Sequence, residues 1–181
     1  STPAADPKNL GFDVNIAGHA AGGLASYLGE ENYGNKKDGF ASSLFAVPGL
    51  DKYHGTDVFV TEALTREATA ALDARDKQKP FFLYMAQYAV HIPINKDKRY
   101  YQKYLDKGMD PKEAAYAGLV EGMDKSLGDL KNYLDSNNLT DNTIIIFMSD
   151  NGGLSAANSG RGGMPNTHNL PLKSGKGSAY E

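Results

Sequence analysis

An acid and an amide stand side by side at Asp150 and Asn151, directly after an apolar run and directly before two glycines. Residues 143–148 read Thr-Ile-Ile-Ile-Phe-Met, a pattern typical of a strand buried on both faces. In open α/β sheets, ligands bind just beyond the carboxyl ends of the strands. Two hard oxygen ligands at such a place suit Ca²⁺ or Mg²⁺. Taken alone the motif favours an ordinary tight turn, because Asp, Asn and Gly also dominate turns.

A histidine follows a second apolar run. Residues 81–86 read Phe-Phe-Leu-Tyr-Met-Ala, and His91 lies a few residues further on, just before Ile92 and Pro93. An imidazole at the end of a strand can donate hydrogen bonds to an anion or transfer a proton. The alternative is a histidine that only satisfies carbonyl groups of its own loop.

Two lysines lie in a glycine-rich stretch over 171–181, at Lys173 and Lys176. Lysines in such a loop can bind an oxyanion as point charges. The stretch is not a Walker phosphate loop, because Leu170 stands where that pattern requires its first glycine. The alternative is a solvated, flexible tail.

A long helix is predicted over 111–134. Asp110 can cap it, and Pro111 stands at the first helical position, where proline is preferred. Asparagines at 137–138 can end it in a left-handed turn. Its apolar residues form one stripe: Tyr116, Leu119, Val120, Met123, Leu127, Leu130 and Leu134.

Other segments are assigned by the same reasoning. They are an extended segment at 11–17, a helix from 56–57 to about Lys77, a short helix at 99–106, and loop-rich chain over 18–55 and 152–181.

The order strand, helix, strand implies a right-handed crossover that joins two parallel strands. Parallel strands end at the same edge of a sheet, so we expect His91 to lie near Asp150 and Asn151. The sequence thus predicts an α/β fold with a mostly parallel sheet flanked by helices, in one domain over 1–181.

Composition excludes several classes of protein. The chain has 181 residues and a net charge of −3 without any basic run, which argues against nucleic acid as a partner. There is no cysteine, and therefore no disulfide, thiolate metal site or cysteine nucleophile. The longest apolar runs are too short to span a membrane.

The pieces in this order resemble the type I sulfatases, a family of the alkaline-phosphatase-like superfamily. The resemblance begins with the apolar run at 81–84 that leads to His91-x-Pro93, and continues with the Ile-rich strand ending at 149–152. It closes with Pro-Leu-Lys-x-Gly-Lys-Gly at 171–177. Gly-Phe-Asp at 11–13 also looks like a family segment. The likeness covers most of 11–181 and is weakest over 18–55.

The resemblance implies roles by position. Asp150 and Asn151 would be two ligands of an active-site cation, usually Ca²⁺ and less often Mg²⁺. His91 would hold the sulfate ester and assist the chemistry at its oxygens. Lys176 would bind the sulfate oxygens, with Lys173 as a second cation nearby. The substrate would be a sulfated carbohydrate or an aryl sulfate, and the location periplasmic or secreted.

The nucleophile of the family does not match this sequence. It is a formylglycine made from Cys or Ser in a Cys/Ser-x-Pro-x-Arg pattern, but Ser1 is followed by Ala5 where arginine is required. The early aspartate pair and the Gly-Lys-Trp-His segment of the family are missing too. We therefore expect an incomplete domain, the central part of a sulfatase, with the formylglycine upstream. By itself it should be inactive and bind metal weakly.

Two other functions remain open. A related phosphodiesterase or phosphonate hydrolase shares the aspartate-based metal site, although such enzymes usually carry histidines close to the metal acids. A non-catalytic module could instead recognise anionic glycans through His91, Lys173 and Lys176. Exposed strand edges would also favour self-association.

Overall fold

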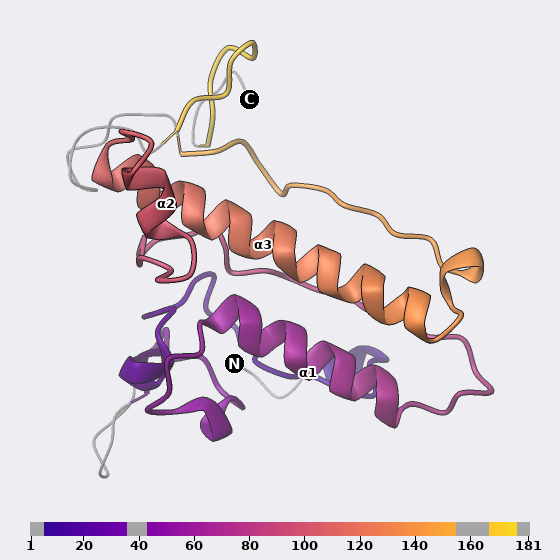
Figure 1. The fold of residues 1–181 in the computed structure, drawn as a ribbon. Helices are drawn as coiled ribbons and strands as arrows, with labels where there is room; N and C mark the ends of the chain where they lie inside the picture. The colour runs from indigo at the N-terminus through magenta and orange to yellow at the C-terminus, as the bar shows by residue number, and fades with distance from the viewer. Residues whose placement is uncertain (1–5, 36–42, 155–166, 177–181) are drawn as a thin grey trace.

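The structure, a computed structural model, describes residues 6–35, 43–154 and 167–176. Its framework consists of α1 (Val60–Ala74), α2 (Tyr101–Leu105) and α3 (Pro111–Ser136). α1 and α3 lie side by side and run in the same direction, and α2 packs at the N-terminal end of α3 (Figure 1). The described residues also form short 3₁₀ helices: η2 (Pro7–Leu10), η3 (Gly29–Gly34), η4 (Asp51–Tyr53) and η5 (Thr140–Asn142).

The predicted caps of the long helix are confirmed. The Asp110 carboxylate accepts a hydrogen bond from the Lys112 amide at 2.8 Å, and Pro111 is the first helical residue. The helix ends at Ser136, and Asn138 then takes the left-handed conformation with φ of 56°. Local signals at both ends therefore fix this helix within the sequence.

The buried face of α3 differs from the predicted apolar stripe. Leu119 and Leu134 are buried as expected, but Val120 of the same stripe is exposed. Gly118 and Gly122 are buried instead, because the chain just before α2 approaches the helix there: a Cβ on Gly118 would lie 3.8 Å from Tyr100 Cβ. The predicted single stripe is therefore buried only in part.

The first helix is shorter than predicted. It begins at Val60 with Phe59 at its N-cap, whose side chain makes no capping bond, and it ends at Ala74 rather than Lys77. Thr56 lies in the preceding turn, where its hydroxyl donates to Tyr53 O at 2.7 Å. Polar residues that looked like a cap therefore serve the turn before the helix.

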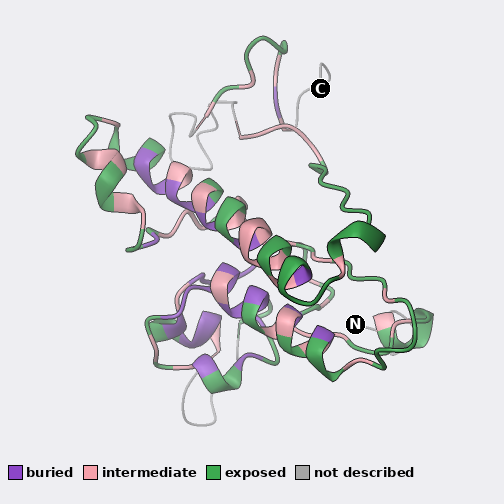
Figure 2. Cartoon of the chain, turned by 45° about the vertical axis from the view of Figure 1, so that its right-hand side comes forward, coloured by how far each residue is buried: buried purple, intermediate pink, exposed green. Residues whose placement is uncertain are grey.

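The core lies in the first half of the chain, around the loops and the start of α1. The buried side chains concentrate there and on the facing sides of α1 and α3 (Figure 2). The cluster consists of Ala17, Leu24, Tyr27, Tyr33, Val47, Leu50, Tyr53, Val58, Phe59, Val60, Ala63, Leu64 and Leu119.

The predicted strands are wrong for the residues that the structure describes. Residues 81–86 and 143–149 are extended but pair with no described neighbour. The segment at 11–17 contains bends and a positive φ of 60° at Ala17, so it is not the extended segment predicted from the sequence. The only β-bridge among the described residues joins Leu28 to Phe59. Ile144, Ile146 and Met148 are 90%, 78% and 80% exposed, and Figure 2 shows this segment exposed along nearly all its length. A strand forms only where another chain segment takes up its hydrogen bonds, and no segment within the described ranges pairs with these two.

Both extended segments nevertheless run as a crossover requires. Each runs in the direction opposite to α3, and each ends near the N-terminal end of that helix (Figure 1). The parallel direction predicted for them is thus present without the sheet.

A chain of hydrogen bonds joins the first of these segments to both long helices. Gln87 Nε2 donates to Ser126 Oγ at 2.9 Å. Ser126 and Thr65 hydroxyl oxygens are 2.6 Å apart, and Thr65 donates to Thr61 O at 2.8 Å, so Ser126 must donate to Thr65. This series of hydrogen bonds fixes the position of Gln87, which directly precedes the turn that carries His91.

Candidate functional site

His91 ends a tight turn that a buried tyrosine closes. The His91 amide donates to Tyr88 O at 2.8 Å. The Tyr27 hydroxyl lies 2.7 Å from Tyr88 O and 2.8 Å from His91 O, so its single proton is shared between both ends of the turn. Tyr27 itself is fully buried and stacks on Phe59, with ring centres 5.2 Å apart. The backbone of His91 is thereby tied to the core.

The orientation of the His91 ring is also defined. Its Nδ1 is 2.8 Å from Ile92 O, and because a carbonyl only accepts, Nδ1 must carry a proton. In the neutral ring, Nε2 is therefore the nitrogen with the free lone pair. The ring lies on Gly23, where an added Cβ would be 3.0 Å from its Cε1.

Asp150 and Asn151 lie in a turn that is followed by Gly152 and Gly153, and the main chain of these two glycines contacts the 167–176 segment. The Gly153 amide donates to Asn169 Oδ1 at 3.1 Å, and Asn169 Nδ2 in turn donates to Ser174 O at 3.0 Å. A Cβ on Gly152 would lie only 2.9 Å from Gly175 Cα. Two glycines thus allow two backbones to touch at this point.

This contact brings one predicted lysine to the turn. The Lys176 amide donates to Gly153 O at 3.1 Å. Lys176 is partly buried, whereas Lys173 is exposed. Neither ammonium group has an ion-pair partner among the described residues.

The acid and amide side chains also have no partner in the part of the chain that the structure describes. Asp150 is exposed and Asn151 is partly buried, and no described residue bonds to the side chain of either. Within the described ranges, no cluster of three or more His, Cys, Asp or Glu residues could hold a metal ion. Asp150 and Asn151 therefore offer two hard oxygens, whereas Ca²⁺ takes about six to eight.

Tyr116, in the second turn of α3, lies between the two halves of the predicted site. Its hydroxyl oxygen would be 3.3 Å from a Cβ on Gly153. It also interacts electrostatically with Tyr27, whose pKa is raised mainly by burial and further by this neighbour. No hydrogen bond or ion pair joins His91 to Asp150 or Lys176 within the described residues.

A second histidine lies behind the turn of His91. The Ala21 amide donates to His19 Nδ1 at 3.2 Å, and the His19 ring centre is 6.0 Å from that of Tyr88. Burial lowers the pKa of His19. The ring is therefore held neutral with its proton on Nε2, which has no partner among the described residues.

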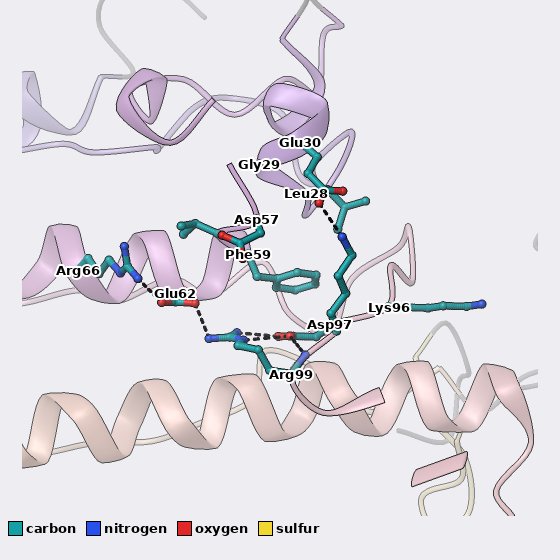
Figure 3. Close-up of a pocket in the computed structure, with 12 residues that line it drawn as sticks. Leu28, Gly29, Glu30, Asp57, Phe59, Glu62, Arg66, Lys96, Asp97 and Arg99 are labelled. Atoms are coloured by element: carbon teal, nitrogen blue, oxygen red, sulfur yellow. Dashed lines mark hydrogen bonds and ion pairs between the residues drawn. The ribbon is translucent and has the colours of Figure 1, made fainter. Parts of the chain in front are cut away.

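The structure also contains a cavity of about 290 Å³ away from these groups, between η3, the start of α1 and the chain before α2 (Figure 3). Most of its charged side chains form ion pairs with one another: Lys98 with Glu30 at 2.6 Å, and Arg66 and Arg99 both with Glu62. Asp57 and Lys96 also line it and form no ion pair with the described residues. None of the predicted site residues lines it. Because most of its cations are already paired with carboxylates, this cavity is a poor candidate for the anion-binding function.

The comparison with known families decides the identity of the fold. The sulfatase family model matches residues 5–181. The chain belongs to the sulfatase family. The described arrangement is accordingly that of a part of the alkaline-phosphatase-like fold.

Relatives and a solved structure agree with this assignment. The chain is 34% identical over 139 residues to a sulfatase of Formosa agariphila, which covers 70% of this chain and 24% of that protein. It is 33% identical over 148 residues to the uncharacterized sulfatase YdeN of Escherichia coli, covering 81% and 23%. The crystal structure of Ps i-CgsB in complex with k-i-k-neocarrahexaose superposes with a TM-score of 0.71 at 29% identity, over 98% of this chain and 39% of that one. The chain therefore spans about a quarter of the length of these two relatives.

Sequence reasoning did not identify the residues that contact the predicted site residues and hold them in place. Tyr27 and Gly23 lie more than sixty positions before His91, in the irregular stretch 18–55. The sequence also carried no signal that Asn169 would bond to the turn of Asp150. A short sequence pattern cannot reveal contacts between residues this far apart. A tyrosine in a glycine-rich loop is nevertheless a usable signal, because a tyrosine that becomes buried usually finds a hydrogen-bond partner for its hydroxyl.

Proposed function

We propose that these residues form the central part of the catalytic domain of a sulfuric ester hydrolase. The family match over 5–181 supports this, together with the main-chain bond that sets Lys176 beside the turn of Asp150. None of the helices in the described part of the chain is long and apolar enough to cross a bilayer. We propose a periplasmic or secreted location from the family.

His91 and Lys176 are proposed to act on the sulfate group. The lone pair on His91 Nε2 can accept a proton, and the protonated ring can donate one to an ester oxygen. The Lys176 ammonium stabilises negative charge that builds up on the sulfate oxygens. Lys173 adds a more exposed cation on the same segment, suited to attracting the anion.

Asp150 and Asn151 are proposed to hold a divalent cation, Ca²⁺ rather than Mg²⁺. Their oxygens fit this role because no described residue competes for them. A cation bound there would withdraw charge from the sulfate oxygens. Two ligands are too few for tight binding, so we expect these residues alone to bind Ca²⁺ weakly. Micromolar affinity in calorimetry of this chain would contradict that.

The nucleophile is proposed to come from other residues of a whole sulfatase. The sequence has no cysteine and no serine in a Ser-x-Pro-x-Arg pattern. A formylglycine elsewhere would supply the attacking oxygen. The 181 residues alone should release no sulfate, and measurable turnover by them would refute this.

We propose a sulfated carbohydrate as the substrate, with aryl sulfates as simpler analogues. The resemblance to Ps i-CgsB, solved with a neocarrahexaose, supports a glycan. The phosphodiesterase and the non-catalytic binding module are less favoured, because the family model and the relatives are sulfatases.

A panel of sulfate and phosphate esters, offered to the whole protein, tests the function. Sulfate release from a glycan or an aryl sulfate, lost on chelation of divalent cations, is expected. Hydrolysis of phosphate esters without sulfate release would favour the phosphodiesterase. Glycan binding without any hydrolysis, abolished by Lys176→Ala, would favour the binding module.

We also propose that the 181-residue chain associates with copies of itself through the exposed segment 143–149. Unpaired strands with apolar side chains tend to pair with other chains. Sedimentation should show oligomers, and Ile144→Lys with Ile146→Lys should reduce them. A monomeric wild-type chain would contradict the proposal.

A further inference from the structure

We propose that residues 23–27 form a cradle that sets the position of His91, with Gly23 and Tyr27 as positioning residues. This rests on the proposed function, in which His91 acts on the sulfate ester. Neither residue touches the substrate in this proposal. Each acts through His91, one on its ring and the other on its backbone.

Tyr27 holds the backbone of His91 through three connections to separate parts of the fold. Its hydroxyl bridges Tyr88 O and His91 O. Its amide donates to Asn95 Oδ1 at 3.0 Å, on the other side of His91. Its carbonyl accepts from the Val60 amide at 2.9 Å, at the start of α1. The loop of His91 is thereby fixed from both sides to a helix in the core.

The hydroxyl of Tyr27 remains a donor over the whole working range of an enzyme. The residue is fully buried, and burial raises its pKa far above the ordinary value for tyrosine. Two carbonyl oxygens that converge on one spot need a donor between them, because carbonyls cannot satisfy each other. Phenylalanine at 27 would keep the ring contact with Phe59, but it would leave His91 O without this donor and Tyr88 O with the His91 amide as its remaining donor.

Gly23 holds the ring by leaving space for it. An added Cβ would be 3.0 Å from His91 Cε1 and 3.1 Å from Nδ1, closer than side chains ordinarily pack. Alanine at 23 would therefore displace the imidazole. The neighbouring Gly22 has open space within 4 Å of its Cβ position, so alanine there meets nothing.

The sequence contains a matched control for each variant. Tyr33 is another fully buried tyrosine of the same core, and its hydroxyl donates to Val58 O at 2.9 Å, away from His91. Tyr33→Phe and Tyr27→Phe each remove one buried hydroxyl, which lies on the carbonyl of Val58 in the first case and on the two carbonyls of the His91 turn in the second. Gly22→Ala and Gly23→Ala restrict the unfolded chain equally. Differences within each pair therefore report on His91.

The test measures kcat and KM of the whole protein on a sulfate ester, and hydrogen exchange of the His91 amide. Tyr27→Phe and Gly23→Ala should lower kcat by about tenfold to a hundredfold, as misplacement of a reacting group does. Tyr33→Phe and Gly22→Ala should leave kcat within about twofold while Tyr33→Phe lowers thermal stability as much as Tyr27→Phe. Exchange of the His91 amide should speed up in Tyr27→Phe only.

Equal kcat within both pairs, with unchanged exchange in Tyr27→Phe, would overturn the cradle. A wild-type protein that hydrolyses no sulfate ester would instead overturn the proposed function. In that case the exchange measurement still decides whether Tyr27 holds the turn of His91, because it needs no substrate.

Discussion

The turn of His91 is anchored in the buried core, whereas the turn of Asp150 is held outside that core, by the side chain of Asn169 and by contacts between main chains. Tyr27 ties the first turn to the start of α1 through fully buried groups. The second turn rests on Asn169 and on the approach of Gly152 to Gly175, after a segment whose large apolar side chains are exposed.

The difference shows that different interactions hold the two halves of the proposed site, the His91 half and the Asp150 half. Burial and long-range hydrogen bonds hold the His91 half within these residues. The Asp150 half has its local geometry but lacks support on both faces of the preceding segment. We expect substitutions to affect stability mainly in the first half and activity in both.

The largest effect is expected at Lys176. Lys176→Ala in the whole protein should lower kcat by about 10²- to 10³-fold, as loss of one charge-stabilising donor does. Its ammonium makes no ion pair within the described residues, so thermal stability should hardly change. Lys131→Ala, on the exposed surface near the other end of α3, serves as the control for kinetics. Equal kcat for Lys176→Ala and wild type would remove Lys176 from the site.

The next effect is expected at Asp97, beside the His91 half. The Asp97 side chain is 1% exposed, and its carboxylate accepts hydrogen bonds from Arg99 Nη2 at 2.6 Å and from Arg99 Nε at 2.9 Å. Asp97→Asn removes the buried charge that binds two guanidinium nitrogens of Arg99 and leaves Glu62 as the charged partner of Arg99. It should cost about 2–3 kcal/mol, less than the loss of a fully buried pair, because Arg99 is partly exposed and keeps Glu62. Urea unfolding measures the change.

Lys98→Ala is the control for Asp97→Asn. It breaks only the exposed pair with Glu30 and should leave the unfolding midpoint unchanged. If the two variants unfold at the same urea concentration, the chain before α2 is not part of a cooperative core.

A moderate effect is expected where Ser126 joins Gln87 to Thr65. Ser126→Ala leaves the Gln87 amide without its acceptor and should cost about 1–2 kcal/mol in urea unfolding. Thr69→Ala removes a hydroxyl that bonds only within α1 and should cost less. A Ser126→Ala protein as stable as Thr69→Ala would show that this connection contributes nothing.

The smallest expected effect is the contribution of His19 to the pH dependence of the free energy of unfolding. Burial lowers the pKa of the folded ring below its ordinary 6.5, so the unfolded chain binds the proton more readily. The free energy of unfolding should therefore fall as pH drops through about 6.5, and level off below the folded pKa. His19→Gln should lose this component when urea unfolding is compared between about pH 7.5 and 5. An unchanged pH profile in His19→Gln would contradict the assignment.

Local signals in the sequence predicted α3 and its ends, because the Asp110 cap and the Asn138 turn act within a few residues. The strands could not be predicted in the same way. The Ile-rich run at 143–148 encodes a strand, but a strand also needs a partner, which no described residue supplies. The cradle of His91 escaped sequence reasoning because Tyr27 and His91 meet only through the tertiary fold.

The contact of Gly152 with Gly175 involves main chain alone. Between these two glycines, the side chain of Asn169 bonds to Gly153 on one side and to Ser174 on the other. Any exchange of this stretch with that of another protein would therefore have to keep Asn169, and glycine at both contact positions, to preserve the spacing between the acid–amide turn and Lys176.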